Sequence, residues 1–405
     1  MAVGLKPPTE LLPIKGIRLA TAEAGIRHHG RPDVTLIEMV HGTRAAAVFT
    51  RNAFCAAPVI VAREHLAASA PRFLLINAGN ANAGMGENGL RDARASCRLL
   101  SERAACIPEA VLPFSTGVIG EPLPVQRFGP AIDRLLIDLR GDGWLDAARA
   151  IMTTDTVAKG VSRQCTIDNR TVSITGIAKG SGMIHPDMAT MLAFIGTDVD
   201  MAAGLLQRAL QQAIKASFNS ITVDGDTSTN DACVLLATGS SEVHVDDVES
   251  AAYRAFYQAL SEVCQQLAQA IIRDGEGATK FVTLDVVEGR DEAEVRQIAF
   301  AVAHSPLVKT ALFASDPNWG RILAAVGRAG VDDLDVGCVW LEINGVRIVS
   351  AGGRDAEYTE AQGAAAMTEA EIAIRIGLGR GSAETRIWTT DLSHEYVRIN
   401  AEYRS

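Results

Sequence analysis

Residues 176–198 have the sequence GIAKGSGMIHPDMATMLAFIGTD, in which a glycine-rich polar loop runs directly into an apolar stretch that begins at Thr190. The apolar part is typical of a buried strand. A threonine at such a junction can simply be a β-branched residue that packs well in a strand. It can also be a nucleophile, provided that a base lies beside its hydroxyl group.

One way to supply that base is to cut the chain before the threonine, which frees the α-amine of the same residue. An α-amine has a pKa of about 7.7–8.0, so it can accept the hydroxyl proton near neutral pH and return it later. Ala189 precedes the threonine and offers little steric hindrance to attack on its carbonyl group. The junction is therefore compatible with a self-cutting enzyme whose nucleophile is Thr190.

Strand-like and helix-like stretches alternate along the 405 residues, which predicts a mixed α/β (α+β) architecture. Residues 72–84 are typical of a buried strand that ends in a loop of small residues. Residues 90–106 are expected to be helical, and apolar residues recur with the helical period in 202–216 and 250–273.

Two hairpins are predicted where alternating segments flank Asp168-Asn169 and Asn344-Gly345, because these residues tolerate the positive φ of a tight turn. No repeat or linker rich in Pro, Gly or Ser marks a boundary between domains. We place the boundary after the segment FVTLDVV, near residue 288.

Composition excludes several classes of protein. A net charge of -10 argues against a nucleic-acid binder, which needs clustered Lys and Arg to neutralise phosphates. No apolar run approaches the roughly 18–20 residues that cross a bilayer, and the N-terminus does not resemble a signal peptide. We therefore expect a cytoplasmic protein with no nucleic-acid or membrane partner.

Cysteine and acidic residues do not indicate a second kind of site. The seven cysteines are scattered without a C-x-x-C pair and are expected to be reduced packing residues. The acidic loop 224–231 lacks the glycine and the final glutamate of a calcium-binding loop, since Thr229 and Leu235 occupy those positions. His185 has no second histidine at metal-ligand spacing, so no metal is predicted.

Several long motifs occur in one order along nearly the whole chain, and together they resemble the ornithine acetyltransferase family, also called glutamate N-acetyltransferases. The motifs are NAGNANAG from Asn77, STGVIGEPLP from Ser115, TTDT from Thr153, KGSGMIHPDMATMLAF from Lys179, SFNSITVDGDTSTND at 217–231, GEGATKF from Gly275, SPLVKTALFASDPNWGRI from Ser305 and the final INAEYRS.

The resemblance implies a precursor that cuts itself between Ala189 and Thr190, which leaves an α chain of 1–189 and a β chain of 190–405. It also implies an N-terminal-nucleophile-like core layered α-β-β-α within 1–288, and a smaller C-terminal α/β domain in 289–405. The C-terminal tail is expected to return to the site. Two α and two β chains are expected to form a heterotetramer.

The implied reaction is ping-pong transfer of acetyl from N-acetylornithine to glutamate through an acyl-Thr190 intermediate. Some family members also accept acetyl-CoA as a donor substrate, and no cofactor is implied. Similarity assigns the oxyanion hole to Thr116 and Gly117. It assigns substrate binding to Thr153, Lys179, Thr190, Glu276, Asn400 and Ser405.

Some alternatives stay open at this point. Thr154 stands beside Thr153, and the sequence does not show which hydroxyl faces the substrate. An autoproteolytic aminopeptidase or amidase would use similar parts, with water in place of glutamate as the acceptor. A structural protein would keep the bond between Ala189 and Thr190 intact.

Overall fold

The computed structural model describes the chain except for residues 1, 28, 186–190 and 403–405. It divides into two compact units. The larger unit consists of Pro7–Asn219 and Asp226–Ile271, and the smaller unit consists of the residues up to Lys6, Ser220–Gly225 and the chain from Ile272 onward.

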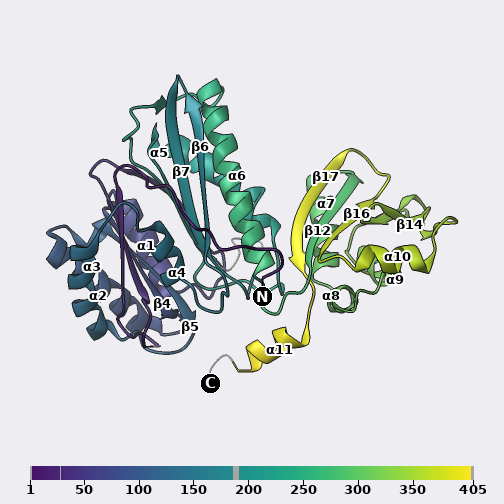
Figure 1. Cartoon of the computed structure of the whole chain (residues 1–405), viewed down its shortest axis with the longest axis horizontal. Helices are drawn as coiled ribbons and strands as arrows, with labels where there is room; N and C mark the ends of the chain where they lie inside the picture. The colour runs from purple at the N-terminus through teal and green to yellow at the C-terminus, as the bar shows by residue number, and fades with distance from the viewer. Residues whose placement is uncertain (1, 28, 186–190, 403–405) are drawn as a thin grey trace. The chain divides into compact units, whose positions relative to one another are not determined.

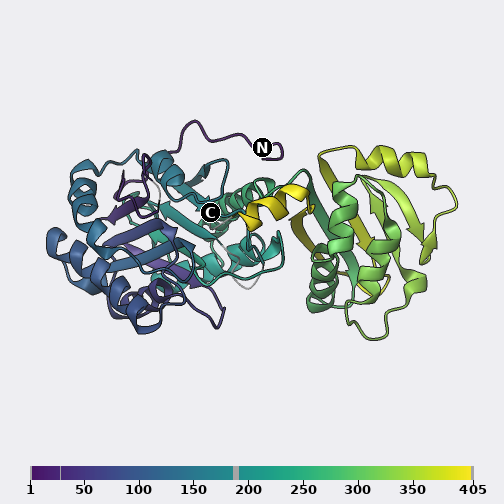
Figure 2. The same cartoon turned by 90° about the horizontal axis from the view of Figure 1, so that it is seen from below.

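Two sheets form the centre of the larger unit. The first has the order β1-β2-β4-β5, and the second has the order β3-β10-β8-β7-β6. Their bounds are β1 Ile17–Ala22, β2 Val34–Met39, β4 Phe73–Asn80 and β5 Val111–Val118 in the first, and β3 Arg44–Phe49, β6 Lys159–Ile167, β7 Arg170–Lys179, β8 Leu192–Thr197 and β10 Ala232–Ala237 in the second. Residues 2–16, purple in Figure 2, lead into β1 without forming a helix or strand.

The two sheets pack face to face through apolar side chains. One buried cluster combines Leu74 of β4 and Leu112 of β5 with Ile177 of β7 and other residues of the second sheet. Within it, the rings of Phe114 and Phe194 meet edge to face with centroids 5.1 Å apart. Strands buried on both faces explain why these segments are nearly continuous apolar runs.

Helices cover the outer face of each sheet. Buried residues of α1 (Ala57–Ala68), α2 (Gly86–Ala104) and α3 (Phe128–Asp138) join a cluster with the first sheet, and Figure 1 shows α2 and α3 outside β4 and β5. On the second sheet, α5 (Ala203–Lys215) packs on β3, and α6 (Ala251–Arg273) runs along β6 and β7 (Figure 1). The α-β-β-α layering expected from the sequence is confirmed in this unit.

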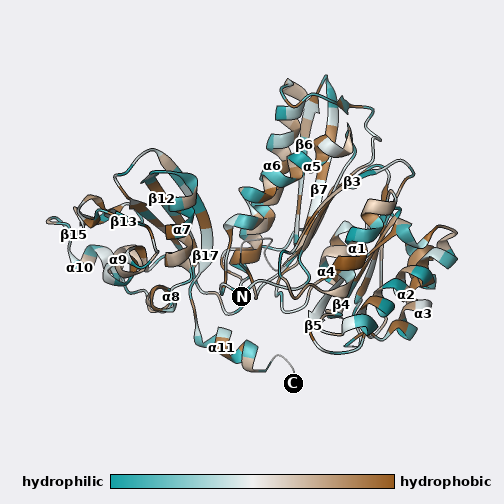
Figure 3. Cartoon of the chain, turned by 180° about the vertical axis from the view of Figure 1, so that it is seen from behind, coloured by the Kyte–Doolittle hydropathy of each residue, from teal (hydrophilic) through white to brown (hydrophobic). Residues whose placement is uncertain are grey.

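The contact between α6 and the second sheet depends on Gly176. A Cβ atom at this position would lie 2.9 Å from a methyl group of Leu267 and 3.0 Å from one of Val263, both on α6. Figure 3 shows hydrophobic and hydrophilic residues mixed along α6, as expected for a helix with one buried face. A short helix, α4 (Trp144–Ala150), adds the buried Trp144 to the core between the sheets.

Local predictions agree well with these elements. The helices predicted at 90–106, 202–216 and 250–273 correspond to α2, α5 and α6. The first hairpin joins β6 to β7, and Asp168 and Asn169 have φ values of 49° and 61°. The second joins β13 to β14, with Asn344 at 46° and Gly345 at 79°.

The smaller unit contains one six-stranded sheet of order β15-β14-β13-β16-β12-β17. Its strands are β12 Phe281–Gly289, β13 Trp340–Ile343, β14 Val346–Ser350, β15 Gly353–Arg354, β16 Glu371–Gly377 and β17 Ala383–Thr390, and its helices include α7 Glu292–Ala303, α8 Pro306–Phe313, α9 Trp319–Gly327, α10 Glu360–Met367 and α11 His394–Ala401. The segment FVTLDVV, after which the sequence placed the boundary, is β12 itself. It pairs with β16 and β17, so it belongs inside this unit.

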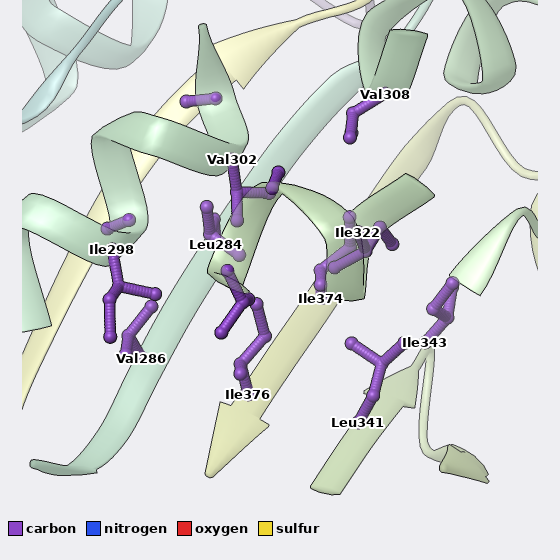
Figure 4. Close-up of a cluster of buried hydrophobic side chains, with 14 of the residues drawn as sticks. Leu284, Val286, Ile298, Val302, Val308, Ile322, Leu341, Ile343, Ile374 and Ile376 are labelled. Carbon is purple, nitrogen blue, oxygen red and sulfur yellow. The ribbon is translucent and has the colours of Figure 1, made fainter. Parts of the chain in front are cut away.

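The core of the smaller unit lies between its sheet and its helices. Figure 4 shows Leu284 and Val286 of β12 near Ile298 and Val302 of α7, in a cluster that α8, α9, β13 and β16 complete. This cluster is separate from the apolar clusters of the larger unit.

Within the described residues, no helix combines the length and apolarity needed to cross a membrane. All seven cysteines are free thiols. Burial raises the pKa of Cys97 and of Cys264 to about 12, which disfavours the reactive thiolate at these two positions.

We predict that Ile298→Ala lowers the free energy of unfolding by about 2–5 kcal/mol, because it leaves a cavity in a fully packed cluster. Ile137→Ala is the control, since Ile137 is 78% exposed, and its effect should stay within about 0.5 kcal/mol. Urea unfolding followed by circular dichroism measures both. Equal effects would contradict the packing described for the smaller unit.

Candidate active site

The motif STGVIG lies where β5 ends beside β4, and its glycine is required by close backbone packing. Gly117 has a φ of +133°, and a Cβ atom there would lie 2.2 Å from the carbonyl carbon of Gly79 and 2.5 Å from the nitrogen of Asn80. No other residue fits this position without moving β4. The glycine thus keeps the backbone around Thr116 in one geometry.

Lys179, the last residue of β7, reaches from the second sheet to the first. Its Nζ lies 3.1 Å from Thr116 Oγ1, and both side chains are buried. An ammonium group has only donors, so the threonine oxygen accepts in this bond. The hydroxyl proton of Thr116 is therefore directed away from Lys179 and is available for another acceptor.

A buried carboxylate organises the loops on either side of this contact. Asp155 Oδ1 accepts from Lys159 Nζ at 2.6 Å and from the Gly180 N–H at 2.8 Å, while Oδ2 accepts from the Thr153 N–H at 3.1 Å. Burial raises the pKa of Asp155, but the charges of Lys159 and Lys179 and the Gly180 N–H outweigh it and hold the pKa below its usual range.

Asp155 thus links two of the predicted site positions, Thr153 and Lys179, although sequence reasoning did not select it. One oxygen fixes the backbone of Thr153, and the other fixes the residue after Lys179. The available signal was an Asp-x-x-x-Lys spacing directly after the TT pair of the motif TTDT. That spacing is common on protein surfaces, and only burial distinguishes this pair.

The adjacent Thr154 has a partner of its own. Its Oγ1 lies 2.7 Å from the Ser181 Oγ, so its hydroxyl joins the loop before β6 to the glycine-rich loop after β7. Thr153 is half-buried, and its backbone N–H is the group that Asp155 binds. The two neighbouring threonines are therefore held in different ways.

The segment Asp226–Asp231, most of the acidic loop, binds the residue after β4 and a residue of β5. The Asn230 amide donates to the Ala81 carbonyl at 2.7 Å and to the Ser115 carbonyl at 2.9 Å. This segment therefore contacts the backbone immediately before Thr116. Its role in the fold is to hold these two backbone segments in place through hydrogen bonds.

In the smaller unit, Glu276 and Asn400 lie together. The Asn400 amide donates to Glu276 Oε2 at 2.8 Å. The pairing depends on Gly277, which has a φ of +69° and where a Cβ atom would lie 2.4 Å from the Tyr396 nitrogen at the start of α11. Ser393 caps α11 and also donates to the Gly277 carbonyl at 2.7 Å, so the helix starts on this glycine loop.

The remaining predicted site residues fall in parts of the chain that the structure does not describe. Ala189 and Thr190, the residues of the expected cut, and Ser405 at the C-terminus lie outside the described residues. Met191 is the first described residue after the proposed nucleophile.

Comparison with known proteins supplies the family. The ArgJ family model matches residues 18–405. The chain belongs to the ArgJ family. The match includes every residue that the sequence motifs selected, in both units.

Two ArgJ relatives match the chain along nearly its whole length. The arginine biosynthesis bifunctional protein ArgJ of Methylococcus capsulatus is 59% identical over 395 residues, which cover 98% of this chain and 97% of the relative. That of Pseudomonas syringae pv. tomato is 54% identical over 406 residues, with both chains covered completely. A crystal structure of ArgJ from Bacillus halodurans matches with a TM-score of 0.50 and 37% identity, covering 52% of this chain and 98% of its own.

We predict that Lys159→Met lowers the free energy of unfolding by about 3 kcal/mol or more, because it removes the closest cation from the buried Asp155. The double variant Asp155→Asn with Lys159→Met should cost less than Lys159→Met alone, since no buried carboxylate is then left. A control is Arg134→Met, which breaks an exposed pair of the same i,i+4 spacing and should cost less than about 1 kcal/mol. Denaturant unfolding of the four proteins measures this, and a Lys159 effect as small as that of Arg134 would contradict the role of the pair.

Proposed function

We propose that this chain is a glutamate N-acetyltransferase of arginine biosynthesis, which moves acetyl from N-acetylornithine to L-glutamate. The observation that carries the proposal is the ArgJ family match over residues 18–405. Relatives 54–59% identical are named arginine biosynthesis bifunctional proteins. Membership of this family favours transfer to an amine over the alternative of an autoproteolytic aminopeptidase or amidase.

The proposed nucleophile is Thr190, freed by a cut after Ala189. In the cut, the Thr190 hydroxyl attacks the Ala189 carbonyl carbon, the C–N bond breaks, and the nitrogen takes up the hydroxyl proton as it becomes an amine. Water then hydrolyses the resulting ester, which leaves a carboxylate on Ala189 and a free hydroxyl on Thr190. The solved Bacillus halodurans chain supports such a cut, because nearly all of it aligns with only 52% of this chain.

In acetyl transfer, the Thr190 hydroxyl attacks the acetyl carbonyl while its α-amine accepts the hydroxyl proton. The tetrahedral intermediate collapses when the proton passes to the leaving ornithine nitrogen, and an acetyl ester remains on Thr190. The amine of glutamate then attacks the ester carbon, the C–O bond to Thr190 breaks, and the proton lost by the glutamate nitrogen restores the Thr190 hydroxyl. The chemistry needs no metal or cofactor. In the ping-pong cycle, N-acetylornithine forms the acetyl ester and glutamate consumes it.

The proposed oxyanion hole consists of the Thr116 hydroxyl and the Gly117 N–H. The contact with Lys179 supports this role, because it makes Thr116 an acceptor on one side and leaves its proton for the oxyanion. A preorganised donor of this kind needs no reorientation as the negative charge develops.

The proposed substrate contacts are Thr153, Lys179, Thr190, Glu276, Asn400 and Ser405. An amino-acid substrate carries a carboxylate and an ammonium group, so a lysine and a glutamate are suitable counter-charges. The hydrogen bond between Thr154 and Ser181 supports Thr153 as the threonine that contacts the substrate.

The cut is proposed to leave an α and a β chain that stay associated and pair into a heterotetramer in the cytoplasm. Both products supply proposed site residues, because Thr116, Gly117, Thr153 and Lys179 precede the cut and the others follow it. Retention of both chains is therefore part of the proposal.

We predict that intact mass measurement finds two chains that meet at residues 189 and 190, and that N-acetylornithine adds one acetyl group to the β chain. Thr190→Ala should stay whole and accept no acetyl group, and Thr190→Ser should keep part of both activities. Thr166→Ala is the control, since Thr166 is exposed on β6 and should be cut and acetylated normally. Active protein with an intact chain, or acetyl on another side chain, would refute the proposed function.

We predict that acetyl-CoA also serves as a donor, in keeping with the word bifunctional in the names of the relatives. The assay supplies purified protein with acetyl-CoA and glutamate and measures N-acetylglutamate. A parallel reaction with N-acetylornithine confirms that the preparation is active. Product only in the parallel reaction would restrict the enzyme to a single donor, and hydrolysis of the ester faster than its capture by glutamate would favour the hydrolase alternative.

A further inference from the structure

The first described residue after the proposed nucleophile is held on both sides by the start of β10. The Met191 N–H donates to Asp231 Oδ1 at 3.0 Å, and the Met191 carbonyl accepts from the Ala232 N–H at 3.1 Å. The neighbouring strands β8 and β10 are parallel, so these contacts begin their ladder. The entry of the chain into β8 is thus fixed by one carboxyl group and one backbone amide.

The second oxygen of this carboxyl group is buried without a hydrogen bond. Asp231 is 1% exposed, and its Oδ2 makes no hydrogen bond to any residue that the structure describes. Burial raises the pKa of Asp231 well above its usual range, although Met191, Ser228 and Lys179 oppose the rise. A positive group beside Oδ2 would stabilise the ionised carboxyl group.

Covalent geometry places such a group nearby once the chain has been cut. The carbonyl carbon of Thr190 is bonded to the Met191 nitrogen, and the Thr190 nitrogen is only two further bonds away. Standard bond lengths keep the two nitrogens within about 4 Å of each other in any conformation. The α-amine therefore lies within about 4 Å of the nitrogen that this carboxyl group already binds.

We propose that Asp231 is a positioning residue for the Thr190 α-amine, accepting a hydrogen bond from it while holding the Met191 N–H. The inference rests on the proposed function, in which that amine is the base. The amine becomes an ammonium group when it takes up the hydroxyl proton, and the carboxylate stabilises this developing charge. The aspartate of a Ser-His-Asp triad acts on its protonated base in the same way.

The test compares Asp231→Asn with wild-type protein. Asparagine keeps the size of the side chain and an oxygen for the Met191 N–H, but it removes the negative charge. The matched control is Asp198→Asn. Asp198 follows β8 at its other end, is 4% exposed, and accepts the Ser173 N–H at 2.9 Å.

The measurements are chain scission by intact mass, kcat and KM with N-acetylornithine, and thermal unfolding. We expect Asp231→Asn to fold and its kcat to fall by about 100-fold with little change in KM, because the charge is needed only when the amine is protonated. A folded variant that is no longer cut supports the same role, since the same nitrogen takes up the proton during the cut. Asp198→Asn should be cut normally and keep its kcat within about threefold.

Two results would overturn the inference alone: wild-type cutting and kcat in Asp231→Asn, or an equal loss in Asp198→Asn. Wild-type protein that stays whole would instead overturn the proposed function, and the inference with it. If Asp231→Asn does not fold, the test compares Asp231→Glu with Asp231→Gln. Both side chains are one methylene longer than that of Asp231, and only the glutamate keeps the negative charge. Faster cutting in the glutamate variant would then support the role, and equal cutting would overturn it.

Discussion

A lysine ammonium group lies buried between two packed sheets, and the polar architecture of the larger unit is arranged around it. Lys179 ends β7 in the second sheet, and its Nζ contacts Thr116 of β5 in the first. A charge in such a position is costly unless other groups compensate it. Asp155 contributes that compensation through its attraction to Lys179, and it binds the next residue along the chain.

The other polar groups lie near the ends of neighbouring strands, close to Lys179. Lys179 pairs with Leu192 at the start of β8, and Leu192 pairs in turn with Ala232 at the start of β10. Asp231 directly precedes β10, and Thr116 lies near the end of β5. Deeper between the sheets the side chains are apolar, as in the contact between Phe114 and Phe194. Rigid apolar packing below and polar groups held at fixed positions above are what a preorganised site requires.

The smaller unit has an apolar core of its own. Its sheet and helices share an apolar cluster that contains no residue of the larger unit. The segment from Gly275 to Gly277 leads from α6 to β12, and α11 begins against it. Because α11 begins against this segment, Glu276 and Asn400 lie together, although 124 residues separate them in the sequence.

The sequence by itself determined the features that depend on short segments. Helical periodicity placed α5 and α6, and two pairs of turn residues with positive φ placed two hairpins, because burial of one face and backbone freedom are both local properties. The motifs around Thr190 and Thr116 pointed to the family in the same way, since a motif is a local string.

Only the tertiary structure decided which distant groups share a site. Nothing local to Asp155 or Asp231 distinguishes it from an aspartate in a surface loop, and each matters because the order of strands buries it beside a partner 25 or 40 residues away. The direction of the Thr116 hydroxyl likewise depends on a lysine 63 residues later. Contacts of this kind follow from sheet order and strand register, which single-chain periodicity does not encode.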